Sequence, residues 1–131
     1  HKTGAAYSGG HIVHGCANAM YLPKVIRFNA VEPDACKRYA EIARFIGLTG
    51  NTDSELTDAL IKHINGLNAA LDIPSRIKDY EGGIIDEKEF IEKLPHVAEL
   101  AVGDACTGSN PRGITPEQME ELLKSCYFDK E

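Results

Sequence analysis

Three of the five histidines lie close together near the start of the chain, and imidazole is well suited both to metal binding and to proton transfer near neutral pH. His1, His11 and His14 fall within fourteen residues, beside four glycines. Spacing alone does not define a coordination set, because a tight metal site needs further ligands. The cluster therefore indicates either a metal or proton-transfer site or a solvated, glycine-rich segment.

The other two histidines and one cysteine show weaker patterns. His63 falls within a predicted helix and His96 follows a proline, and neither has a partner in the sequence, so both are interpreted as structural or solvated. Cys106 follows Asp104 by two residues, but no histidine lies close in the sequence. A catalytic thiol is therefore not favoured.

Residues 107–112 combine small polar side chains with Arg112, which is a composition that can hold an anion. The same residues are also typical of a chain reversal. The favoured interpretation is a tight loop in which Asn110 and Arg112 fasten one helix to another.

The elements that must position these residues are predicted to be helices. Apolar residues recur at helical spacing, and no segment alternates as a strand does. Residues 77–85 contain two glycines and predict a loop with at most one turn. The fold class is therefore all-α, a helical bundle. The predicted helices cover residues 14–29 with a bend at Pro23, 33–46 closed by Gly47, 52–71, 86–94, 95–105 with Pro95 in its first turn, and 115–126.

Two of these helices begin with a capping-box pattern. Thr52 is followed three residues later by Glu55, and Thr115 is followed by Pro116 and Gln118. The apolar positions that follow each start predict one buried face. These positions are Leu56, Leu60, Ile64, Leu67 and Leu71 in the first helix, and Met119, Leu122, Leu123 and Cys126 in the second.

The composition excludes several functional classes. The 131 residues carry a net charge of −6, with no basic stripe, so nucleic-acid binding is not expected. No apolar run approaches membrane-spanning length. The four cysteines are widely spaced and predict reduced thiols in a cytoplasmic protein. Residues 1–131 are expected to form a single helical domain.

The segment 14–29 reads HGCANAMYLPKVIRFN. It is similar to the signature H-G-x-A-N-A-x-x-L-P-x-V-x-x-F-N of iron-containing, group III alcohol dehydrogenases. The similarity continues through residues 38–43, 73–74 and 104–112, and ends with a helix that leads to Tyr127. The resemblance therefore covers essentially the whole chain.

The resemblance implies a helical domain like the C-terminal domain of dehydroquinate synthase-like proteins and iron-containing alcohol dehydrogenases. In that family an aspartate and three histidines hold the metal, and the last of these histidines matches His14. His1 resembles the second histidine of an H-x-x-x-H pair, which is assigned to proton relay. The resemblance thus implies His14 as a metal ligand and His1 as a catalytic residue.

One departure from the family pattern concerns the link between these two residues. Segment 8–10, Ser-Gly-Gly, resembles an insertion of about three residues relative to the family's shorter link. As a result, His11 keeps the common spacing from His1, while His14 keeps the context of the signature. His14 is the preferred metal ligand, and His11 is the alternative.

By resemblance, the full-length protein is an oxidoreductase that interconverts primary alcohols or diols with aldehydes or ketones. Its cofactors would be a divalent metal, Fe²⁺ or else Zn²⁺, and NAD(P)H. The alternatives are a glycerol or diol dehydrogenase, the alcohol dehydrogenase part of a bifunctional aldehyde-alcohol dehydrogenase, and, in another class, a non-catalytic helical binding module.

The chain begins in the middle of the family pattern and is therefore expected to be a fragment. It lacks the N-terminal nucleotide-binding domain and the first part of the helical domain, so it keeps only one of the family's metal ligands. Alone it is expected to be inactive. The expected partners are a small alcohol or aldehyde, the missing domain and a second copy in a homo-oligomer.

Overall fold

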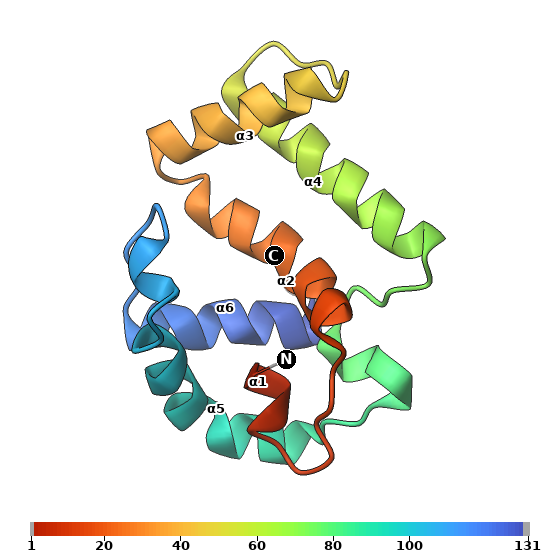
Figure 1. The fold of residues 1–131 in the computed structure, drawn as a ribbon, viewed down its shortest axis with the longest axis vertical. Coiled ribbons are helices and arrows are strands. Elements are labelled where there is room, and N and C mark those ends of the chain that lie inside the picture. Colours follow the sequence, from red (N-terminus) through yellow and green to blue (C-terminus); the bar gives the residue numbers. More distant parts are fainter. Residues whose placement is uncertain (1, 130–131) are drawn as a thin grey trace.

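The computed structural model describes residues 2–129, and in that part of the chain it contains helices, turns and loops but no strand. The predicted all-α class is therefore confirmed. Helix α2 crosses the middle of the molecule, with α3 and α4 on one side of it and α5 and α6 on the other (Figure 1). The elements are α1 (Lys2–Ala5), α2 (His14–Asn29), α3 (Pro33–Phe45), α4 (Asp53–Ala70), the 3₁₀ segment η1 (Ile77–Gly82), α5 (Glu87–Val102), the 3₁₀ segment η2 (Thr107–Ser109) and α6 (Pro116–Phe128).

The main core lies between α2, α5, α6 and η1 and is centred on aromatic rings. Phe90 of α5 stacks on Tyr127 of α6, with ring centroids 4.1 Å apart and an interplanar angle of 10°. The Tyr127 hydroxyl donates a hydrogen bond of 2.8 Å to the Ile85 carbonyl oxygen. This bond satisfies a buried hydroxyl that would otherwise destabilise the core.

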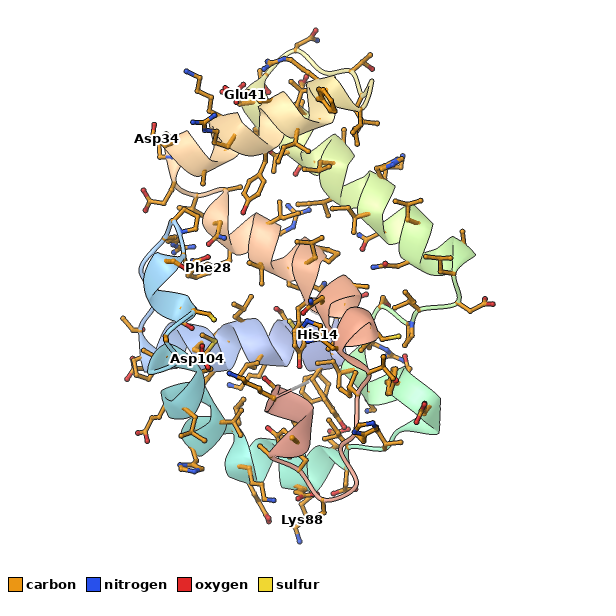
Figure 2. The ribbon with its side chains drawn as sticks, viewed as in Figure 1. His14, Phe28, Asp34, Glu41, Lys88 and Asp104 are labelled. Carbon is orange, nitrogen blue, oxygen red and sulfur yellow. The ribbon has the colours of Figure 1, made fainter. Side chains whose placement is uncertain are left out.

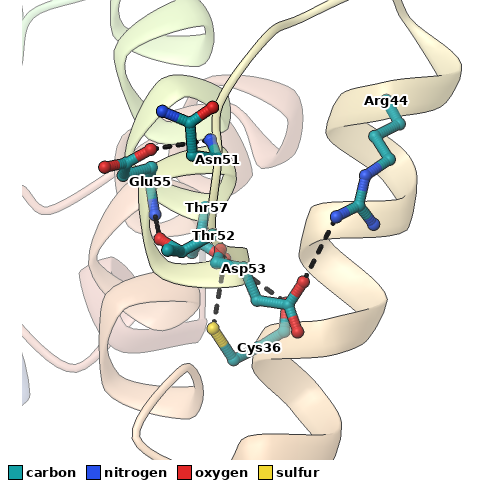
Figure 3. Close-up of polar contacts among 7 residues, drawn as sticks. All are labelled: Cys36, Arg44, Asn51, Thr52, Asp53, Glu55 and Thr57. Carbon is teal, nitrogen blue, oxygen red and sulfur yellow. Dashed lines mark hydrogen bonds and ion pairs between the residues drawn. The ribbon is translucent and has the colours of Figure 1, made fainter.

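A second, smaller core joins α3 and α4 to the far half of α2. Thr57 of α4 is buried, and its hydroxyl donates to the Asp53 carbonyl oxygen at 2.9 Å and lies 3.5 Å from the Cys36 sulfur of α3 (Figure 3). On the exposed edge, Arg44 pairs with the Asp53 carboxylate at 3.4 Å. The Cys36 thiol therefore contributes a polar contact between the two helices.

The helix starts follow the capping signals in the sequence. The Thr115 hydroxyl accepts from the Gln118 N–H, and the Gln118 side chain accepts from the Thr115 N–H, so this capping box is confirmed. At α4 only half of the expected pattern forms. Thr52 accepts from the Glu55 N–H, but the Glu55 carboxylate accepts from the Asn51 N–H at 2.7 Å rather than from Thr52 (Figure 3).

The prediction of two helices separated at Pro95 is wrong. Residues Glu87–Val102 form one helix, α5, with Pro95 inside it. A proline there cannot donate to the carbonyl four residues earlier, which is that of Ile91. Both residues lie on the exposed side of α5, where water can satisfy that carbonyl. Pro23 likewise lies inside a single helix, α2.

The apolar residues of α3 and the predicted apolar face of α4 are only partly buried. Ile42 and Ile46 are 49% and 46% exposed, and Leu67 and Leu71 are also exposed. The contact surface of α3 is instead made of alanines, namely Ala35, Ala40 and Ala43. Helices whose contact residues are small approach each other closely, so larger neighbours are left at the edge of the contact. In residues 2–129, no helix has both the length and the hydrophobicity that crossing a bilayer requires.

Candidate functional site

The loop that leads into α2 requires glycine at two positions. A Cβ atom at Gly10 would lie 2.1 Å from the Gly4 carbonyl oxygen, so a side chain cannot be accommodated there without moving the backbone. Gly9 adopts φ +71°, in the left-handed region that favours glycine. Residues 8–10, which resemble an insertion relative to the family pattern, thus form a tight turn against α1.

Two residues of α5 hold this loop in place. The Glu89 carboxylate accepts from the Ser8 N–H at 2.8 Å and from the Lys93 ammonium at 2.6 Å. Lys93 also donates to the Ala6 carbonyl oxygen at 3.1 Å. Lys93 first, and then the Ser8 N–H, lower the pKa of Glu89 to about 2. The ionised carboxylate therefore anchors the segment that sets the position of α2.

His14 is the first residue of α2, and its side chain is exposed (Figure 2). Its Nε2 atom lies 3.1 Å from the Asn18 amide nitrogen, one helical turn further along. The preceding residue is fixed as well, because the Val13 N–H donates to the Tyr80 hydroxyl at 3.4 Å. The role of Asn18 was not predicted, although its i, i+4 spacing from His14 is the signal that could have indicated it.

The described residues do not complete a metal site around His14. His11 is exposed and precedes α2 by three residues, and His1 lies outside the described residues. Among residues 2–129, no group of three or more His, Cys, Asp and Glu side chains is placed to hold a metal ion. A single imidazole does not bind a divalent ion tightly, so the described residues do not by themselves form a metal site.

The far end of α2 is locked to the loop that contains η2. The side-chain amides of Asn29 and Asn110 bond to each other, and Asn29 also donates to the Tyr39 hydroxyl at 3.2 Å. Arg112 donates to the Phe28 carbonyl oxygen at 2.7 Å and lies over the Phe28 ring, 3.8 Å from its centroid (Phe28 is labelled in Figure 2). The interpretation of segment 107–112 as a fastening loop is thus confirmed.

Asp104 is held by contacts with Lys2 and with both the backbone and the side chain of Cys106. Its carboxylate accepts from the Cys106 N–H at 2.9 Å and from Lys2 of α1 at 3.1 Å (Asp104 is labelled in Figure 2). The Cys106 N–H and then Lys2 lower the pKa of Asp104. His63 and His96 are both exposed, on α4 and α5.

The helical arrangement matches solved structures of one enzyme class. It superposes on the iron-containing alcohol dehydrogenase of Thermococcus thioreducens with a TM-score of 0.76 and 32% identity, over 91% of this chain and 29% of that one. Residues 1–127 match the family described as "Fe-containing alcohol dehydrogenase family, C-terminal". The chain therefore belongs to the iron-containing alcohol dehydrogenase family and corresponds to its C-terminal helical domain.

Two curated relatives give the scale of the similarity. The chain is 47% identical over its full length to the NADPH-dependent butanol dehydrogenase of Clostridium saccharobutylicum and covers 32% of that protein. It is 39% identical to an aldehyde-alcohol dehydrogenase of Clostridium acetobutylicum, over 97% of this chain and 16% of that protein. The chain thus spans a third or less of the length of these relatives.

Proposed function

We propose that this chain is the metal-side domain of a metal-dependent, NAD(P)-linked alcohol dehydrogenase that interconverts primary alcohols or diols with aldehydes or ketones. The observation that carries the proposal is His14, the signature histidine, exposed at the start of α2 in a domain of this family. An exposed imidazole at a helix start is accessible to a second domain. The proposal concerns the longer protein, and the chain alone is expected to be inactive.

The proposed role of His14 is to donate one imidazole nitrogen to an Fe²⁺ or Zn²⁺ ion whose other ligands lie outside this chain. When bound, such an ion acts as a Lewis acid on the substrate oxygen while the nicotinamide exchanges hydride. Asn18 holds the His14 ring through the Nε2 contact, and Glu89 with Lys93 fixes the loop before it. His11 is the alternative donor, and His1, by resemblance, is the proton relay.

The proposed nucleotide site lies outside this chain, since the chain matches the C-terminal part of the family and covers 32% of the NADPH-dependent relative. The name of the 47% identical relative supports NADPH and a short primary alcohol such as butanol. The aldehyde-alcohol dehydrogenase relative supports the alternative of a bifunctional parent. A glycerol or diol substrate, a cytoplasmic location and a homo-oligomeric state remain parts of the proposal that rest on the family resemblance and the composition.

The test compares four versions of the full-length gene product, namely the wild type and the His14→Ala, His11→Ala and His63→Ala variants, each stripped of metal with a chelator and then reloaded with Fe²⁺ or Zn²⁺. Metal content is measured by mass spectrometry, and alcohol-dependent NAD(P)⁺ reduction is followed spectrophotometrically. We expect His14→Ala to lose most of the bound metal and the activity. The matched control is His63→Ala, an exposed histidine on α4, which should keep both.

Two results would contradict the proposal. Full metal occupancy in the His14→Ala protein, with His11→Ala losing the metal instead, would transfer the ligand role to His11. A wild-type full-length protein with no activity under any metal or nicotinamide cofactor would favour the non-catalytic helical binding module.

A further inference from the structure

The prolines inside α2 and α5 each leave one backbone carbonyl without its usual donor, and the two carbonyls lie in different surroundings. Pro95 frees the Ile91 carbonyl on the exposed side of α5, where water can reach it. Pro23 is buried in α2 and frees the carbonyl of Ala19, four residues earlier, which is half-buried. A carbonyl group inside a protein needs a hydrogen-bond partner, so this one requires a donor from another segment.

Asn68, in the last turn of α4, supplies that donor. Its side-chain amide donates to the Ala19 carbonyl oxygen at 2.9 Å, across 49 residues of sequence. Asn68 is only 8% exposed, so water does not easily replace this bond. Its backbone is fixed as well, because the Asn68 carbonyl oxygen accepts from the Leu71 N–H at 3.2 Å and from the Ile73 N–H at 2.8 Å. A firmly held amide of α4 thus takes the place of the N–H that α2 lacks.

The missing helical bond divides α2 into two parts, and the first part carries His14. His14 lies nine residues before Pro23, which is about 13 Å along a helix. Proline is a usual site of helix bending, and a change of roughly 10° in that bend moves His14 by about 2 Å. Metal ligands must lie within about 0.2 Å of their ideal distances. Whatever fixes the bend at Pro23 therefore also determines whether His14 can act as a ligand.

The other polar contacts that fix the start of α2 come from elements on one side of it. The Val13 N–H donates to Tyr80 of η1, and the preceding loop is held by Glu89 of α5. Asn68 belongs to α4, which lies on the other side of α2 from α5 (Figure 1). Contacts on one side leave a helix able to tilt away from them, so the bond from Asn68 completes the support of the first part of α2.

We propose that Asn68 is a positioning residue for His14. Its bond to the Ala19 carbonyl oxygen replaces the helical bond that Pro23 removes and sets the direction of the first turns of α2. When this bond is lost, the first part of α2 tilts and the imidazole leaves its place. The inference rests on the proposed function, which assigns His14 to the metal, but the position of the ring can also be measured without a metal.

The first experiment records the nuclear magnetic resonance signals of the histidine rings in the metal-free full-length gene product. The His14 signal is assigned from its loss in the His14→Ala variant. Asn68→Ala should shift the His14 signal, while the signal of His96 on α5 stays in place. The matched control is Asn65→Ala, which removes an exposed amide one turn earlier on α4 and should leave the His14 signal unchanged.

The second experiment measures how the metal is held in the same full-length proteins. The Kd for Zn²⁺ is obtained by competition with a chelator, and the visible spectrum of the Co²⁺-loaded protein reports the geometry of the ligands. Asn68→Ala should raise the Kd for Zn²⁺ about tenfold or more, the effect typical of residues that orient a ligand. It should also change the Co²⁺ spectrum, whereas Asn65→Ala should change neither.

A third experiment tests whether Asn68 replaces the N–H that Pro23 lacks. Asn68→Ala is introduced into the wild type and into the Pro23→Ala variant, and urea denaturation gives the midpoint of each protein. The N–H that Pro23→Ala introduces can bond to the Ala19 carbonyl within α2. Asn68→Ala should therefore lower the midpoint clearly in the wild type and much less in the Pro23→Ala background. Equal losses in the two backgrounds overturn the inference.

The outcomes separate this inference from the proposed function. An unchanged His14 signal, or an unchanged Zn²⁺ affinity and Co²⁺ spectrum despite a lower denaturation midpoint, makes Asn68 a purely structural residue and overturns the inference even in an active dehydrogenase. A wild-type protein that binds no metal rejects the proposed function, and the His14 signal and the Pro23→Ala comparison then decide the inference. If Asn68→Ala does not fold, Asn68→Asp, which keeps the shape of the side chain but has no N–H, takes its place.

Discussion

Asn29 and Asn110 form a reciprocal amide pair, in which the Asn29 nitrogen lies 2.9 Å from the Asn110 oxygen and the Asn110 nitrogen lies 2.7 Å from the Asn29 oxygen. Asn29 is only 2% exposed, so water cannot replace its partner. The pair joins the last turn of α2 to a loop that is 81 residues away in the sequence. It therefore fixes the end of α2 opposite to His14.

Asn29→Ala and Asn110→Ala should each lower the free energy of unfolding by about 1–3 kcal/mol, because each leaves the oxygen of the other amide without its donor. The double variant should lose less than the sum of the two, since the second change removes the orphaned group. Denaturant titration measures all three, with Asn51→Ala, an exposed loop position, as the control. Strictly additive losses would show that the two amides do not depend on each other.

Pro95→Ala should raise the free energy of unfolding by about 1–3 kcal/mol, because it restores the N–H that α5 lacks at that position and removes a steric clash. The matched control is Pro116→Ala, at the first position of α6, where proline suits the helix. There the same change should cost about 0.4–1 kcal/mol, since the unfolded chain gains freedom. If the two substitutions change the free energy of unfolding in the same direction, the position of Pro95 inside an intact helix does not explain the effect of Pro95→Ala.

The Glu89 carboxylate makes the free energy of unfolding depend on pH in the acidic range. Its pKa is lowered to about 2 in the folded protein from an ordinary value of 4.5, so its contribution is fully present above pH 4.5 and is lost as the pH falls toward 2. Glu89→Gln should therefore reduce stability at pH 7 and flatten its decline between those two pH values. Denaturation at a series of pH values checks this, and Glu92→Gln, an exposed neighbour on α5, should leave the wild-type decline unchanged.

The helices could be predicted where local signals agreed with one another. Thr115, Pro116 and Gln118 specify the start of α6 through bonds within four residues, and the structure reproduces them. The fastening role of Asn110 and Arg112 could be predicted because the small polar residues of segment 107–112 are typical of a chain reversal between two helices. The all-α class followed from the helical spacing of the apolar residues along the chain.

The remaining features depend on tertiary contacts that local patterns do not contain. Pro95 is a helix breaker by itself, yet the buried residues Phe90, Leu94 and Val97 hold α5 together across it. The contact of Glu89 with Ser8 joins positions 81 residues apart. Ile42 is half exposed because alanines bring α3 and α4 into closer contact than the larger side chains can share.

The separation of the two cores has a consequence for how the domain loses its structure. Helices α3 and α4 can unfold as a cooperative unit of their own, because their core shares only α2 with the rest of the molecule. Amide hydrogen exchange should then be faster in α3 and α4 than in α5 and α6. The end of α2 that bears His14 belongs to the larger core, so opening of the outer pair reaches it through the bond from Asn68 to the Ala19 carbonyl oxygen.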